Sequence, residues 1–279
     1  MEKKRTKKWN KALAIVFAVV VFLVAFFFTY GEISMVCAHK WKPWRPDYEK
    51  RDITAAVQNP QKTEEDYHLI YEQTGLTKIG VDGLIAAGKT KKIYEIQKGY
   101  FQESPLEREN VGFYACLEEI DFLMPHCELE AGDILVSNST HVMNFRLGHA
   151  ALVLNKFGNI LEGLRPGENS DITGISVFMQ MSSFMILRPK LPKEVRASVA
   201  KYAENHLTGV EYSLFTGIFT KKASIKKTQC AHIVWYSYYK FGYDFDSNGG
   251  LVVTPGEIAN SPELEVVQIY GYHPEKLWK

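Results

Sequence analysis

The segment Thr228–Asp246, "TQCAHIVWYSYYKFGYDFD", carries a lone cysteine at the start of an aromatic, apolar run. The run predicts a helix from Cys230 to about Gly242, because glycine is favoured just past a helix C-terminus. A thiol at a helix N-terminus feels the positive end of the helix dipole, and Lys226 and Lys227 add positive charge. These conditions favour the thiolate and make Cys230 a candidate nucleophile. A buried structural cysteine is the alternative interpretation.

A nucleophilic cysteine needs a base and a group that orients the base. Among the eight histidines, His149 in "RLGHAALVLN" has the best context, since it begins a β-type run directly after Gly148. A four-residue loop in the following hairpin pairs Ala151 with Glu162, so Glu162 lies diagonal to His149 on one face. The alternatives are a strand-edge histidine bonded to the backbone and a solvent-facing glutamate.

In the rest of the chain, helical runs and β-type runs lie in separate blocks. That arrangement predicts an α+β domain with a mostly antiparallel sheet and an N-terminal helical segment. The expected strands are 132–137, 149–155, 159–163, 184–189 and 264–272, and the expected helices are 66–76, 81–101, 191–207 and the one that begins at Cys230.

The N-terminus has a different composition. Residues 12–28 are uncharged and apolar, and with Thr29–Gly31 they reach the ~20 residues that a bilayer crossing needs. A cleaved signal peptide is the competing interpretation, but its apolar region is usually shorter and ends in a small-x-small site. The preceding cations would hold this end in the cytoplasm, which predicts a single-pass cell-membrane protein with an extracellular C-terminal body. These cations are Lys3, Lys4, Arg5, Lys7, Lys8 and Lys11.

Four regions follow from these patterns. Residues 1–31 are the predicted tail and signal anchor, 32–62 a stem, 63–125 a helical segment packing on the core, and 126–279 the catalytic domain. The net charge is +1, and the charged residues of the body have mixed signs, which argues against nucleic-acid binding.

The four cysteines and one acidic motif bear on disulfides and metals. Export would permit a disulfide, and Cys116 and Cys127 are the pair closest in sequence. No zinc-type cysteine and histidine spacing occurs, so neither a metal nor a cofactor is expected. The stretch "DFDSNG" at 244–249 matches the opening of a calcium loop, but Pro255 stands where the bidentate glutamate belongs. An Asp/Asn/Gly turn is the better interpretation.

Three motifs together resemble a known family: "GDILVS", "LGHAALVLN…ILEG" and the late "TQCAHIVWYSYYKFGYDFDSNGGLVVTPGEIANSPEL". They are similar to the permuted branch of the NlpC/P60 superfamily, and more narrowly to the YiiX/YebB-like cysteine hydrolases, over residues 129–264. In this branch the histidine strand precedes the cysteine helix, as it does here. Relatives often have serine after the cysteine, whereas this chain has Ala231.

The resemblance implies a circularly permuted papain-like fold with Cys230 as nucleophile, His149 as base and Glu162 as orienting residue. It implies a hydrolase of amide bonds, with cell-wall peptide as a natural substrate, and by analogy Tyr212 is a candidate pocket wall; a core aromatic is the alternative for Tyr212. Other permuted members act on lipids or transfer acyl groups, so an acyl substrate is the second expectation. An anchored, catalytically silent binding module is the third.

Overall fold

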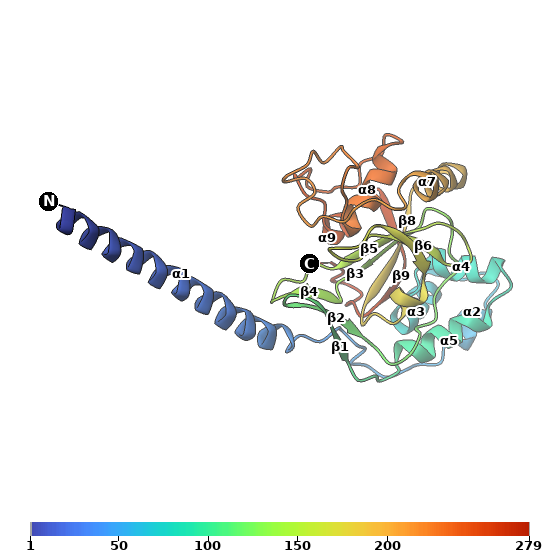
Figure 1. Cartoon of the computed structure of the whole chain (residues 1–279). Coiled ribbons are helices and arrows are strands. Elements are labelled where there is room, and N and C mark those ends of the chain that lie inside the picture. Colours follow the sequence, from blue (N-terminus) through green and yellow to red (C-terminus); the bar gives the residue numbers. More distant parts are fainter. Residues whose placement is uncertain (1, 279) are drawn as a thin grey trace.

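The computed structural model describes residues 2–278, without the side chains of residues 2–8 and 10. The side chains of Lys3, Lys4, Arg5, Lys7 and Lys8 therefore lie outside the described part of the chain. Figure 1 shows a long helix, α1 (Glu2–Ala38), projecting from a body in which helices cover both faces of a sheet.

The body is built on a six-stranded sheet in the order β7-β6-β5-β3-β8-β9, and every neighbouring pair is antiparallel. This arrangement confirms the predicted α+β class with an N-terminal helix and antiparallel sheets. The strands are β3 (Ile134–Ser137), β5 (His149–Val153), β6 (Asn159–Glu162), β7 (Asp171–Gly174), β8 (Phe184–Pro189) and β9 (Leu264–Tyr270).

Side chains on the two faces of this sheet build two separate cores, as the alternation of a strand requires. In β3, Leu135 joins the core beneath the N-terminal helices, whereas Ile134 and Val136 join the core beneath the C-terminal helices. The first group of helices is α2 (Thr54–Gln58), α3 (Glu64–Thr74), α4 (Lys78–Ala86) and α5 (Lys91–Tyr100), and the second is α7 (Lys193–His206), α8 (Cys230–Tyr239) and α9 (Pro255–Ala259). The short α6 (Ser176–Met179) precedes β8.

A second sheet has three strands in the order β1-β2-β4. Its strands are β1 (Glu107–Gly112), β2 (Ala115–Glu119) and β4 (Thr140–Val142). The hairpin β1-β2 lies within residues 63–125, which the sequence predicted to be a helical segment packing on the core, and it follows the two stretches that were expected to be helices. The predicted helix over 81–101 is also divided, because Gly88 adopts a left-handed φ of 70° between α4 and α5.

Residues 32–62, the predicted stem, lie partly against the body. Its first residues continue α1 to Ala38, and its later ones pack on the body. The N–H of Trp44 donates to the carbonyl of Gly271 at 3.1 Å, and Ile53 is 1% exposed. Residues 41–61 are mostly polar, but their apolar side chains, such as those of Trp44 and Ile53, account for this packing.

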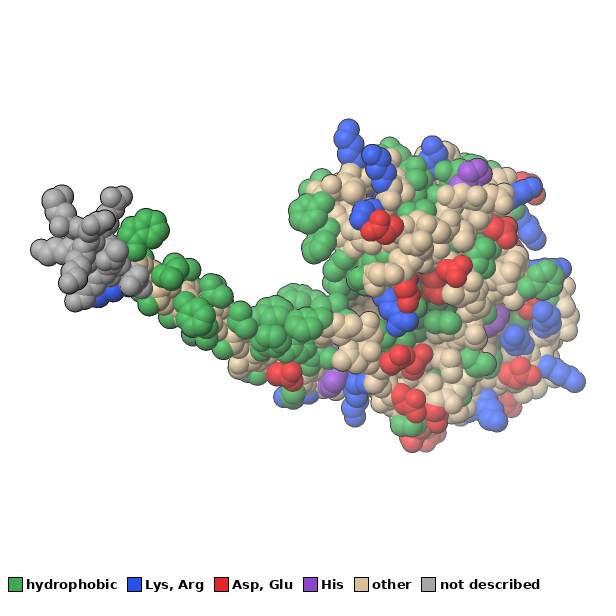
Figure 2. All heavy atoms as spheres, viewed as in Figure 1, with side chains coloured by type: hydrophobic (Ala, Val, Ile, Leu, Met, Phe, Trp, Pro, Cys, Tyr) green, Lys and Arg blue, Asp and Glu red, His purple; other side chains and the backbone are tan. Residues whose placement is uncertain are grey.

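By length and composition α1 can cross a membrane. The apolar part runs from Lys11 to Ala38, and none of its most hydrophobic window is buried against the body. Figure 2 shows this helix covered by hydrophobic side chains that face outward. At its C-terminal end the helix meets the tip of the β1-β2 hairpin, where Tyr114 donates to the carbonyl of Phe28 at 3.3 Å and Phe113 stacks on Phe27. Such a helix is either a membrane anchor or a signal sequence.

Candidate active site

The hairpin β5-β6 brings His149 and Glu162 together. Nε2 of His149 lies 2.6 Å from Oε2 of Glu162, and the two side chains are 3% and 2% exposed. The predicted register is confirmed: Leu152 pairs with Leu161, and the N–H of Leu154 donates to the carbonyl of Asn159. The loop is the four-residue turn 155–158. This register makes Glu162 the diagonal neighbour of His149 across the strand pair.

Two further contacts hold this pair in position. The hydroxyl of Thr173 in β7 donates to the second carboxylate oxygen of Glu162 at 2.5 Å. The ring of Phe178 in α6 stacks on the His149 ring, with 5.3 Å between centroids. The hydrogen bond to Glu162 at the ring edge and the stacked Phe178 ring together restrict the orientation of the imidazole.

Cys230 is the first residue of α8 and is 8% exposed. Its sulfur lies 3.4 Å from Oε1 of Gln229, the residue that caps the helix. The same Gln229 oxygen accepts from the N–H of Ala231 at 2.8 Å, which leaves the thiol at the open N-terminal end of the helix. The sequence-based prediction of a helix that begins at Cys230 is confirmed.

The ionisation of His149 reflects contact with both neighbours. Burial lowers the pKa of His149, but hydrogen bonds and charge interactions with Cys230 and Glu162 outweigh burial and raise it to about 10. Burial raises the pKa of Glu162, and here too the interaction with His149 outweighs burial, so that its pKa lies below the usual 4.5. Since Nε2 faces Glu162, Nδ1 is the ring nitrogen available to the thiol.

Gly163 and Tyr212 lie beside the start of α8. A Cβ on Gly163 would lie 3.8 Å from the backbone nitrogen of Cys230 and 3.5 Å from the Tyr212 ring, so the end of β6 passes close to the start of α8. Burial and the charge of Cys230 raise the pKa of Tyr212. The structure therefore gathers all four residues singled out in the sequence: Cys230, His149, Glu162 and Tyr212.

Sequence reasoning missed three contacting residues: Gln229, Thr173 and Phe178. Gln229 directly precedes the cysteine and caps α8, but glutamine is not one of the residues that commonly cap a helix N-terminus, so composition gave no signal. Thr173 lies on an edge strand too polar to stand out, and Phe178 sits in a four-residue helix far from the hairpin in sequence. Nothing in the local pattern pointed to the last two.

The segment 244–250 is a series of turns closed by its own side chains, which confirms the interpretation of "DFDSNG". Oδ1 of Asp244 accepts from the N–H of Asp246 at 3.0 Å, and Oδ1 of Asn248 accepts from the N–H of Gly250 at 2.6 Å. Asp244 also accepts from the indole of Trp235, and Asp246 pairs with Lys222. The side-chain oxygens of Asp244, Asp246 and Asn248 thus already have partners in the turn, in α8 and at Lys222.

The predicted disulfide is wrong. Cys116 and Cys127 are both buried free thiols. Cys116 lies on β2 facing two histidines, whereas Cys127 belongs to the core beneath the N-terminal helices, and its N–H donates to Gln268. Proximity in sequence did not bring the two thiols together because the chain leaves β2 before it reaches Cys127.

Comparisons with family models, with curated proteins and with solved structures gave no match to this chain. The site is therefore interpreted from its own geometry and from the motifs in the sequence.

Proposed function

We propose that this chain is a membrane-anchored cysteine hydrolase that cleaves amide bonds, with a domain of the permuted papain-like type. One observation carries the proposal: a cysteine at a helix N-terminus shares a buried site with a histidine whose far nitrogen is held by a glutamate at 2.6 Å. Catalysis by a thiol needs a nucleophile, a base that contacts it, and a third group that orients the base. Cys230, His149 and Glu162 would take these three roles. Cell-wall peptide is the substrate class that the resemblance favours.

In the proposed reaction, the thiol proton of Cys230 passes to His149. The pKa of about 10 at His149 means that the ring keeps this proton at neutral pH, and Glu162 stabilises the resulting charge. The thiolate attacks the carbonyl carbon of the substrate, and the carbonyl oxygen becomes an oxyanion near the backbone N–H of Cys230. His149 then protonates the leaving amine, and water releases the acid from the acyl-thioenzyme.

Thiol reactivity tests this proposal directly. Iodoacetamide labelling is measured at pH 6 in a Cys37→Ser background, because Cys37 is the exposed cysteine. We expect Cys230 to react faster than an ordinary thiol, which is mostly protonated at this pH. His149→Ala should slow labelling of Cys230 and lower turnover of a peptide amide by about 100-fold or more.

The buried Cys127→Ala variant is the matched control and should change neither rate. The hydrolase proposal would be contradicted if Cys230 reacted no faster than an ordinary thiol. It would also be contradicted if the His149→Ala protein were labelled at the parent rate. Fast labelling without turnover on any amide or ester would favour the silent binding module instead.

A specific surface feature favours an acyl substrate as the second candidate. The segment 213–219, between Tyr212 and Cys230, exposes Leu214, Phe215, Ile218 and Phe219, the last of them 79% exposed. Figure 2 shows hydrophobic side chains on the part of the surface where Figure 1 draws the orange loops beside α8. The start of this segment is tied to the chain just before Cys230, since the N–H of Ser213 donates to the carbonyl of Thr228 at 2.6 Å. An exposed apolar surface in this segment suits a lipid-like acyl chain.

The two substrate classes are separated by one pair of variants. Phe219→Ser should lower turnover of a long-chain acyl ester several-fold and leave a short peptide amide unaffected. Phe157→Ser is the control, because Phe157 is 82% exposed at the tip of the β5-β6 hairpin. Equal effects of both variants on ester turnover would remove the acyl candidate.

A further inference from the structure

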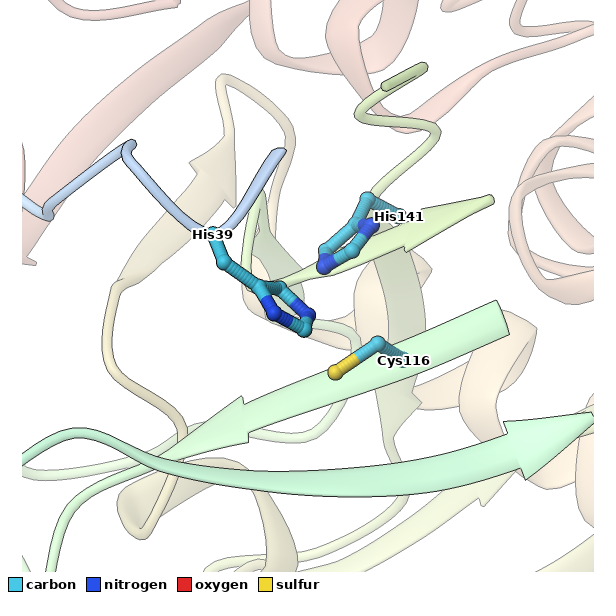
Figure 3. Close-up of side chains that lie close together, drawn as sticks. All are labelled: His39, Cys116 and His141. Atoms are coloured by element: carbon cyan, nitrogen blue, oxygen red, sulfur yellow. The ribbon is translucent and has the colours of Figure 1, made fainter. Parts of the chain in front are cut away.

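A cluster of metal-binding side chains lies outside the candidate active site, on the three-stranded sheet. His39, Cys116 and His141 each direct one ligand atom inward, and all three atoms lie within 4.8 Å of one another. Figure 3 shows the two imidazole rings and the sulfur converging from three separate parts of the chain. Sequence spacing could not reveal this group, because its members come from the turn after α1, from β2 and from β4.

The sheet pre-organises two of the three ligands. Cys116 and His141 are direct partners in the antiparallel register of β2 and β4. Side chains at such positions lie ~4.5–5.5 Å apart at Cβ and on the same face. Both residues are buried, at 3% and 1% exposed. His39 reaches over them from the turn after α1, with its ring 5.7 Å from that of His141.

The hydrogen bonding of His141 indicates a vacant ligand atom. Its Nδ1 lies 2.7 Å from the carbonyl oxygen of Met143. A carbonyl only accepts, so Nδ1 carries the hydrogen, and Nε2 of the neutral ring presents a lone pair. Nε2 is buried and has no hydrogen-bond partner among the described residues. Metal-bound histidines commonly have their other nitrogen fixed in this way by a backbone carbonyl.

One carboxylate and two arginines lie beside the cluster. Oε1 of Glu118 lies 3.8 Å from Nε2 of His141, too far for a hydrogen bond. Arg146 holds the Glu118 carboxylate at 2.7 Å, and Arg108 approaches it at 3.3 Å. Glu118 thus supplies negative charge beside the cluster, and both of its carboxylate oxygens are paired with arginines.

We propose that His39, Cys116 and His141 form a zinc site that fastens the end of α1 to the three-stranded sheet. One thiolate and two imidazoles are a donor set that Zn²⁺ prefers, and the fourth position stays open to water on the side of the exposed His39. Binding forms a Zn–S bond, and the thiol proton of Cys116 is released to solvent. The site needs no catalytic residue and stands independently of the proposed hydrolase.

Cobalt serves as the spectroscopic probe. The full-length chain in detergent is stripped with a chelator and titrated with Co²⁺ in a Cys230→Ala background, which removes the other thiol–histidine pair. We expect a thiolate-to-cobalt charge-transfer absorption that saturates at one equivalent and that Zn²⁺ abolishes. Cys116→Ser should remove this absorption. His39→Ala, a change in an exposed side chain, should weaken binding by more than the roughly 10–100-fold typical of an outer-shell change.

Cys37→Ser and Cys127→Ala are the controls and should keep the parent absorption. Zn²⁺ should also raise the melting temperature of the parent but not of His39→Ala, because a ligand that binds only the folded state stabilises it. The proposal is overturned if the parent gives no charge-transfer absorption, if Cys116→Ser retains it, or if His39→Ala binds as tightly as the parent. If Cys116→Ser fails to fold, the His39→Ala comparison decides alone.

Discussion

Cys116 and His141 face each other as register partners on β2 and β4. Nothing in the sequence around either residue predicts that the two are neighbours. The pair His149 and Glu162 is the opposite case, because strand alternation and loop length alone bring these two into contact. Four predictions test what these and other contacts contribute.

Glu162→Gln should make stability less dependent on pH. Because the folded pKa of His149 is raised from 6.5 to about 10, its charge stabilises the fold fully below pH 6.5 and progressively less up to about pH 10. Removing the carboxylate should therefore cost about 1.5–3 kcal/mol at pH 6 and much less at pH 10. Urea unfolding of both proteins at several pH values measures the difference. Glu168→Gln, at an exposed ion pair with Arg165, is the control and should show no such trend.

Gly148→Ala should destabilise the fold and displace His149. Gly148 has a φ of 75°, and a Cβ there would lie 2.5 Å from the carbonyl oxygen of Ser137. The left-handed conformation alone costs an alanine ~1–2 kcal/mol, and the backbone clash adds to it. Gly83→Ala, in α4 with no atom within 4 Å, should instead stabilise by up to ~1 kcal/mol. Equal melting temperatures for the two variants would contradict this reasoning.

Asp133→Asn should cost about 3–5 kcal/mol, because it leaves buried positive charge poorly compensated. Asp133 is fully buried at the start of β3 and accepts from Arg188 at 2.7 and 2.8 Å. Chemical denaturation measures the loss. Glu211→Gln, which removes an exposed pair with Lys227, should change stability little. If Asp133→Asn lowered the free energy of unfolding no more than Glu211→Gln does, the buried ion pair of Asp133 would not contribute much to stability.

Protease added to intact cells should remove the body and leave a short α1 fragment in the membrane. The expectation rests on the apolar helix Lys11–Ala38 and on the cations that precede it in sequence. Epitope tags at the two ends report the outcome. Loss of the N-terminal tag with release of the body into the medium would instead identify a cleaved signal peptide, and full protection of the body would contradict an external location.

The sequence predicted the elements that are built on continuous apolar runs. The hairpin β5-β6 and the start of α8 followed from such runs and from one polar residue at a defined end. The strands β1 and β7 escaped prediction because neither has such a run: residues 107–112 are almost entirely exposed and mostly charged or polar, and the four residues 171–174 are exposed at both ends. The cluster of His39, Cys116 and His141 escaped because only tertiary packing unites its members.

The last strand of the sheet also holds the first helices of the body. Thr77 at the start of α4 donates to the carbonyl of Val266 in β9 at 2.6 Å, and the N–H of Ile269 donates to the carbonyl of Gly75. A ribosome makes the two sides of these contacts almost 190 residues apart. The contacts between the start of α4 and β9 consequently form only after β9 has been made, and Cys230 likewise reaches His149 long after the hairpin β5-β6 has been made. A chain interrupted between β8 and Cys230 would lack both the β9 contacts and the thiol–histidine pair.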